Sequence, residues 1–176
     1  ASAVATQGIA VLYTYFKFMM SFYVALAVLW LALVAVGWFF LGKRILRLLH
    51  EIKEAFFLSF ATASSEAAYP KILDALDRFG VSRKISSFVM PLGYSFNLDG
   101  SMMYCAFASL FIAQVYGIEM SVGTQIAMLL TLMVTSKGMA GIPSASLVVI
   151  AGTLAQFDLP VVGMVLILGV DRFLDM

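Results

Sequence analysis

The feature that most constrains this chain is an uncharged run of 23 residues, Met19–Leu41. A helix of about 20 apolar residues is long enough to cross the hydrocarbon core of a bilayer. Trp30 and Trp38 in this run are aromatic residues of the kind that gather at membrane interfaces. The run therefore predicts a membrane-spanning helix that begins a turn or more before Met19, with Lys17 extending its ammonium towards the interface.

The composition of the whole chain also indicates a membrane protein. Hydrophobic residues make up 62% of the 176 residues and charged residues 12%, against roughly 25% charged in soluble domains. A net charge of +1 does not indicate a nucleic-acid partner, and one Cys with one His excludes an internal disulfide and a multi-histidine metal site. No cofactor is expected. The chain starts without Met and still has a helical pattern at Met176, so we expect a fragment of a longer protein.

Charge and hydropathy divide the chain into five segments. Residues 43–84 hold eight basic residues and the loop Gly117–Gly123 holds none, so the positive-inside rule puts residues 43–84 on the cytoplasmic side. The expected segments are a spanning helix (1–42), a cytoplasmic-side re-entrant hairpin (43–84), a broken spanning helix (85–118), an outer-side re-entrant hairpin (119–159) and the start of a last, truncated spanning helix (160–176).

Two apolar stretches, Ala55–Tyr69 and Thr124–Thr135, are too short to span a bilayer. The first has charges on both flanks, which keeps its ends on one side, and Pro70 is expected to open a second amphipathic piece up to Gly80. The second leads into a segment rich in Gly, Ser and Ala, residues 136–146. Such backbone survives at membrane depth only where protein or a water-filled cavity surrounds it, so both stretches predict re-entrant hairpins.

The apolar stretch Ile85–Ile118 is interrupted by Asn97-Leu98-Asp99-Gly100-Ser101, which predicts a helix broken near mid-bilayer. A carboxylate there is costly unless it is paired or binds a cation. Oxygen ligands suit a hard cation, so Asp99 indicates a cation site. The alternative is a kink in which Asp99 has only a structural hydrogen bond.

A hairpin followed by a span occurs twice in the chain, with the same spacing between the hairpin tip and the polar residue of the span. From Ser65 to Asp99 is 34 residues, and from Gly141 to Asp175 is also 34. Because the two units enter from opposite sides, this predicts an all-α membrane protein with an inverted repeat, and interrupted segments in corresponding positions indicate a transport site.

Asp171 and Asp175 lie on one helical face. Asp175, deeper in the span, is a candidate counter-charge for a cationic ligand group. One of the two aspartates can instead be an end-of-span residue paired with Arg172. Three other polar or thiol side chains have open roles. Glu66 can cap a half-helix or carry a proton, Lys137 is expected to extend towards the outer face, and Cys105 is expected to be a packing residue.

Four motifs occur in order: Ser64-Ser65-Glu66 before Pro70, Asn97–Ser101, Ser136–Pro143 and Gly169–Met176. Together they resemble the dicarboxylate/amino acid:cation symporters, with the bacterial glutamate/aspartate branch nearest. The resemblance implies a multi-pass protein of the cell (inner) membrane, a homotrimer whose transport domain moves as an elevator, and a chain that corresponds to the later part of the family's sequence.

The resemblance also implies two sets of site residues. The substrate set is Ser64, Ser65, Ser101, Ile142, Pro143, Ser144, Ala145, Ser146 and Asp175. The cation set is divided between two positions. Gly93, Asn97 and Asp99 match cation ligands in the broken helix, and Ser95, with the backbone carbonyls of Ser136, Lys137 and Met139, matches a second cation position near the outer hairpin. An arginine that the family carries three residues after Asp175 would lie beyond Met176, and Cys105 stands where animal relatives carry a protonatable Glu. The coupling ion therefore stays open between H⁺ and Na⁺.

The function predicted from this resemblance is uptake of L-glutamate or L-aspartate coupled to H⁺ or Na⁺, not enzymatic catalysis. Asp175 favours amino acids over C4-dicarboxylates, but a C4-dicarboxylate or neutral amino acid symporter is an alternative. An intramembrane aspartyl protease is an alternative of another class, with Asp99 pairing Asp171 or Asp175. It is disfavoured because Asp99 lacks a Gly-x-Gly-Asp pattern. A passive channel lined by Asp99 ranks below transport.

Overall fold

The computed structural model describes residues 9–96, 98–137, 139 and 144–175. Within those residues the chain is helical and contains no strand, which confirms the predicted all-α class. The elements are α2 (Ile9–Leu41), α3 (Arg44–Thr62), α4 (Ser65–Phe79), α5 (Arg83–Phe96), α6 (Asp99–Val115), α7 (Val122–Thr135), α8 (Ser146–Gln156), the 3₁₀ turn η1 (Val161–Gly163), α9 (Met164–Leu168) and α10 (Asp171–Leu174).

Among the described residues, two helical stretches are, by length and composition, long and apolar enough to cross a membrane. The first is Leu12–Leu41, with a mean hydropathy of 2.6, and the second is Arg83–Val115, with a mean hydropathy of 1.3. The helix predicted from the uncharged run is confirmed, including its earlier start, because α2 begins at Ile9. Large apolar side chains on α2, among them Leu31 and Phe39, are exposed in this chain, as expected for a surface that faces lipid or other helices.

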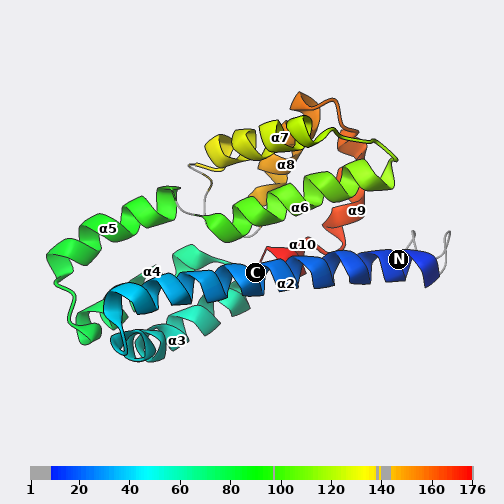
Figure 1. The fold of residues 1–176 in the computed structure, drawn as a ribbon. Coiled ribbons are helices and arrows are strands. Elements are labelled where there is room, and N and C mark those ends of the chain that lie inside the picture. Colours follow the sequence, from blue (N-terminus) through cyan, green and yellow to red (C-terminus); the bar gives the residue numbers. More distant parts are fainter. Residues whose placement is uncertain (1–8, 97, 138, 140–143, 176) are drawn as a thin grey trace.

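The helices α3 and α4 pack against each other beside α2 (Figure 1). The turn between them is set by Ala63, which has a left-handed φ of 49°, and by Ser64, whose hydroxyl accepts a hydrogen bond from the Ala67 N–H at 3.4 Å. This is an N-cap, which satisfies a free N–H of the first helical turn.

The prediction that Pro70 opens a second amphipathic piece is wrong, because Pro70 lies inside α4. The helix has already been started by the Ser64 cap, so Pro70 removes one backbone hydrogen bond without ending it. The predicted end at Gly80 is confirmed. Gly80 has a φ of 107°, and its N–H and that of Val81 donate to the Leu76 carbonyl.

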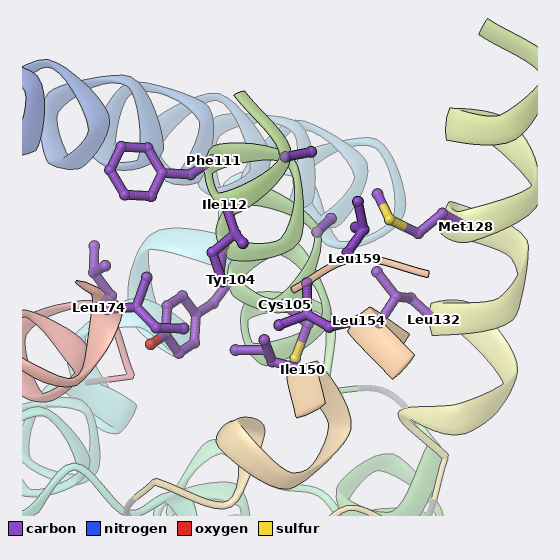
Figure 2. Close-up of a cluster of buried hydrophobic side chains, with 14 of the residues drawn as sticks. Tyr104, Cys105, Phe111, Ile112, Met128, Leu132, Ile150, Leu154, Leu159 and Leu174 are labelled. Atoms are coloured by element: carbon purple, nitrogen blue, oxygen red, sulfur yellow. The ribbon is translucent and has the colours of Figure 1, made fainter. Parts of the chain in front are cut away.

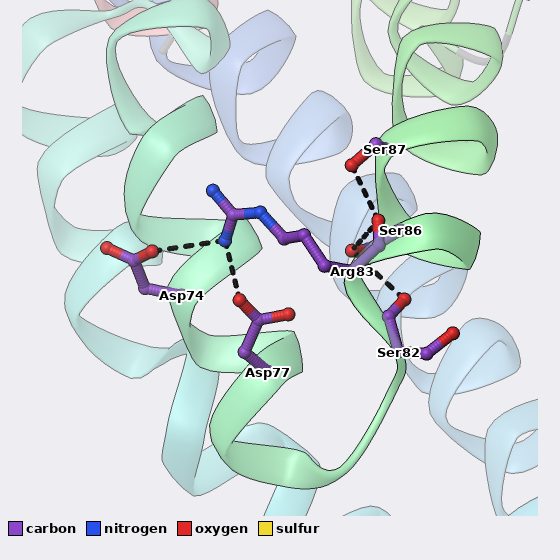
Figure 3. Close-up of polar contacts among 6 residues, drawn as sticks. All are labelled: Asp74, Asp77, Ser82, Arg83, Ser86 and Ser87. Atoms are coloured by element: carbon purple, nitrogen blue, oxygen red, sulfur yellow. Dashed lines mark hydrogen bonds and ion pairs between the residues drawn. The ribbon is translucent and has the colours of Figure 1, made fainter.

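Ion pairs hold the first pair of helices and the start of α5 in register. Arg78 in α4 donates to Glu51 in α3 at 2.9 Å, and this bond lowers the pKa of the Glu51 carboxyl. Arg83 at the start of α5 contacts Asp74 and Asp77 at 3.3 and 2.6 Å (Figure 3). All these groups reach solvent, so we expect them to orient the helices more than to stabilise them.

The core is built around α6, which contacts α2, α7, α8 and α9. Its buried residues include Tyr104, Cys105, Ala108 and Ile112, all with no exposed surface (Figure 2). Several of the buried positions on α6 are small, which lets neighbouring helices approach closely. From α2, Phe18 stacks on Phe111, with ring centroids 4.3 Å apart.

The last segment, where the sequence predicts the start of a spanning helix from Pro160, is divided into short helical pieces. It consists of η1, α9 and α10, with a break at Gly169 and Val170. Both residues have a low helix propensity, since Gly169 is a glycine and Val170 is β-branched. The side chains beyond the break, Asp171 and Asp175, are hydrogen-bonded to other elements.

A valine at position 163 should destabilise this core. A Cβ on Gly163 would lie 2.5 Å from Ile112 Cγ2 and 3.1 Å from Tyr116 Cε2. Overpacking of this kind costs about 1–3 kcal/mol, so Gly163→Val should lower the melting temperature of the natural protein in detergent. Gly152→Ala in α8 is the matched control, because a Cβ there meets nothing within 4 Å. Equal melting of Gly163→Val and wild type would contradict the packing described here.

Candidate functional site

The segment that leads into α8 is hydrogen-bonded to the end of the chain. The Ser144 N–H donates to Asp175 Oδ2 at 2.7 Å, and the Ser146 hydroxyl donates to Asp175 Oδ1 at 2.6 Å. Ser144 has a positive φ of 63°, and both its N–H and its hydroxyl donate to carboxylates. Ala145 is the N-cap residue of α8. Three residues of the predicted substrate set, Ser144, Ser146 and Asp175, therefore meet here.

A second carboxylate belongs to the same network. Asp171 is only 4% exposed, and it accepts a hydrogen bond from the Tyr104 hydroxyl at 2.7 Å and one from the Ser144 hydroxyl at 2.6 Å. Figure 2 shows the Tyr104 hydroxyl directed towards the ribbon that carries Leu174. Ser144 thus donates to both carboxylates, one through its N–H and one through its hydroxyl.

Asp171 is not the end-of-span residue paired with Arg172 that the sequence analysis considered. It is buried and bonded to hydroxyl groups from α6 and from the segment before α8. Tyr104 was missed as a site residue. The signal that could have found it is a tyrosine inside an apolar helix, since a buried tyrosine hydroxyl normally has a hydrogen-bond partner. Cys105 is buried, as expected of a packing residue, and its thiol lies 3.7 Å from the Ser146 carbonyl.

Four of the predicted site residues, three from the cation set and Ser101 from the substrate set, lie next to the interval between α5 and α6. Gly93 and Ser95 lie in the last turn of α5, which ends at Phe96, and Asp99 and Ser101 lie in the first turn of α6. Ser136 is buried just after α7, and the Met139 N–H donates to the Ser136 carbonyl at 3.2 Å. The predicted residues Asn97, Ile142 and Pro143 lie outside the described residues.

Lys137 joins these two groups. Its ammonium donates to the Phe96 carbonyl at the end of α5. The sequence predicted a side chain that extends towards the outer face, and the structure shows its ammonium bonded to a carbonyl of another helix. The reason is electrostatic, because the carboxyl end of a helix carries partial negative charge and attracts a cation.

The first tip lies against α5. The Tyr94 hydroxyl donates to the Ser65 carbonyl at 2.9 Å, and the Tyr69 and Tyr94 rings meet edge to face, with centroids 5.1 Å apart. A cavity of about 340 Å³ is lined by Glu66, Tyr69, Pro91, Tyr94 and Ser95. The Ser64 hydroxyl caps α4, and Ser95 borders both this cavity and the end of α5.

The chemistry available here is that of oxygen ligands and hydrogen-bond donors. In the described part of the chain, no group of three or more His, Cys, Asp and Glu side chains could hold a metal ion together. Carbonyl oxygens, hydroxyls and a single carboxylate instead resemble the ligands that suit monovalent cations.

Comparison with known proteins agrees with this chemistry. The model of the sodium:dicarboxylate symporter family matches residues 1–176. The chain is 52% identical over 135 residues to a proton/sodium-glutamate symport protein of Bacillus caldotenax. That match covers 77% of this chain and 32% of that protein. It is 46% identical over 152 residues to a proton/glutamate-aspartate symporter of Escherichia coli, and the match covers 85% of this chain and 35% of that protein.

A C4-dicarboxylate transport protein of Bacillus subtilis is 43% identical over 125 residues, covering 70% of this chain and 30% of that protein. The chain thus spans about a third of the length of these relatives. The family and these relatives are transporters, which removes the support for a protease. The match over the whole length shows that this chain belongs to the sodium:dicarboxylate symporter family.

Proposed function

We propose that the natural protein carrying this chain is a secondary active symporter that takes up L-glutamate or L-aspartate together with H⁺ or Na⁺. The observation that carries this proposal is the pair of hydrogen bonds from Ser144 and Ser146 to Asp175. They link a segment rich in small residues to an acidic group that can bind an ammonium. Relatives named as glutamate symporters support the choice of substrate.

In this proposal Asp175 binds the substrate amino group. Both of its carboxylate oxygens have a donor from the segment 144–146, so an incoming ammonium competes with that segment for the same oxygens. Substrate binding therefore changes how the segment is held. The serines of the first tip, Ser64 and Ser65, together with Ser101 and residues 142–146, complete the substrate site.

The coupling cation binds at the interruption between α5 and α6. Asp99 supplies a charge, and Gly93 and Asn97 supply further oxygens. Ser95 and the backbone carbonyls of Ser136, Lys137 and Met139 form a second cation position beside it. A carboxylate with several neutral oxygen ligands suits a monovalent cation, and a proton can take its place on the carboxylate.

The remaining architecture follows the same proposal. Residues 43–84 and 119–159 are re-entrant hairpins from opposite sides, each followed by a spanning segment, 85–118 and 160–176, in an inverted repeat. Residues 1–42 form the spanning helix before them. The two hairpins and their spans move together as the transport domain of a homotrimer in the cell membrane, with residues 43–84 on the cytoplasmic side.

The second candidate is transport of C4-dicarboxylates, because several relatives carry that name. A C4-dicarboxylate has no ammonium for Asp175 to bind, and its negative charge would be repelled by an unpaired carboxylate. A neutral amino acid keeps the ammonium but lacks the side-chain carboxylate. The three substrate classes thus place different demands on one site.

A competition assay separates these substrates. The natural protein is reconstituted in proteoliposomes, and uptake of labelled L-glutamate is measured with an excess of unlabelled L-aspartate, succinate or L-serine. We expect aspartate alone to compete strongly. Strong competition by succinate would favour the dicarboxylate carrier, and strong competition by serine would favour a neutral amino acid carrier.

A further inference from the structure

The ammonium of Lys137 occupies the carboxyl end of α5. Lys137 follows α7, and its N–H donates to the Val134 carbonyl at 3.1 Å. Its Nζ donates to the carbonyl of Phe96, the last residue of α5, across 41 positions of sequence. The contact therefore joins the second small-residue segment to the interrupted helix.

The end of α5 is a place that attracts positive charge. The last carbonyl groups of a helix have no partner within the helix and together carry about half a negative charge. Because α6 begins at Asp99, this end lies in the middle of the second candidate span instead of at its margin. The half-buried Asp99 adds a carboxylate to the same region.

The Lys137 side chain is exposed in this chain, yet its ammonium is bonded to another helix of the protein. Its long stem would let the ammonium reach a membrane interface, and a lysine within a membrane is costly unless it has a partner. Here the ammonium is turned onto a carbonyl oxygen, the same kind of ligand that replaces water around alkali cations in selective sites. An ammonium also carries the same single charge as such a cation.

We propose that Lys137 is a tethered cation, which fills a monovalent-cation position at the carboxyl end of α5 so that no free cation is needed there. This inference rests on the proposed symport. It adds that one positive charge of the site, the Lys137 ammonium, stays in place throughout transport. Because the ammonium is covalently attached, an ion gradient cannot drive it through the transport cycle. Only the position at Asp99 is then left for a coupling ion.

Removal of the tethered charge tests this inference. In Lys137→Met, uptake of L-glutamate at low Na⁺ should fall by at least about tenfold, the effect of losing a hydrogen bond to a charged group. Raising Na⁺, or adding ethylammonium as a free substitute, should restore it. Lys137→Arg keeps the charge and should retain more uptake at low Na⁺ than Lys137→Met. The matched control Lys84→Met, at the other end of α5, should behave like wild type.

A second readout does not depend on transport. The melting temperature in detergent should rise with Na⁺ or ethylammonium more in Lys137→Met than in wild type. The inference is overturned if both proteins respond equally to these cations, or if no cation restores folding or uptake of Lys137→Met. If wild type transports none of the substrates, the proposed function fails, and the melting comparison still decides whether Lys137 replaces a cation.

Discussion

Asp175→Asn should abolish the uptake of acidic amino acids, with uptake at least about 100-fold below wild type. The amide cannot pair its charge with the substrate ammonium. Its NH₂ group also cannot accept a hydrogen bond, so it loses either the Ser144 N–H or the Ser146 hydroxyl as a donor. The measurement is initial uptake of labelled L-glutamate by proteoliposomes that contain equal amounts of protein.

The matched control for this change is Asp74→Asn, which removes the same charge from an exposed ion pair with Arg83 (Figure 3). This variant should take up glutamate like wild type. Retention of wild-type uptake kinetics by Asp175→Asn would remove the role proposed for Asp175 and return the choice of substrate to the dicarboxylate alternative.

Asp171→Ala should have the second-largest effect, raising the substrate concentration needed for half-maximal uptake by about tenfold. The change leaves the Tyr104 and Ser144 hydroxyls without their carboxylate acceptor. Ser144 then loses one of the bonds that orient its N–H towards Asp175. We therefore describe Asp171 as a positioning residue whose effect reaches substrate through Ser144.

A double-mutant cycle distinguishes this role from general destabilisation. Tyr104→Phe should reproduce part of the defect, and the double variant with Asp171→Ala should be no worse than Asp171→Ala alone, since both remove the same hydrogen bond. Tyr116→Phe is the control, because Tyr116 is 46% exposed at the end of α6. Additive defects in the double variant would show that Tyr104 and Asp171 do not act as a unit.

The elements that local signals control were predicted well from the sequence. The uncharged run specified α2, and Gly80 ended α4, because these features depend on neighbouring residues alone. Pro70 was misread for a related reason. A proline usually marks a boundary, but here the cap at Ser64 had already started the helix.

The parts that were missed depend on contacts between distant residues. Tyr104 and Asp171 are 67 positions apart, and Lys137 and Phe96 are 41 apart. No local pattern distinguishes a tyrosine that packs from one that also donates to a buried carboxylate. The packing of α6 against residues 171–175 assigns the Tyr104–Asp171 pair, and it buries Asp171. The Lys137–Phe96 pair depends on how the segment after α7 lies against the end of α5.

The measurement that tests symport most directly is accumulation against a gradient. Proteoliposomes that contain the natural protein are loaded with L-glutamate at the outside concentration, and an inward gradient of H⁺ or Na⁺ is imposed. We predict that internal glutamate rises above the external concentration with at least one of these gradients, and that an ionophore which collapses that gradient abolishes the rise. Glutamate that stays at the external concentration under both gradients would contradict symport.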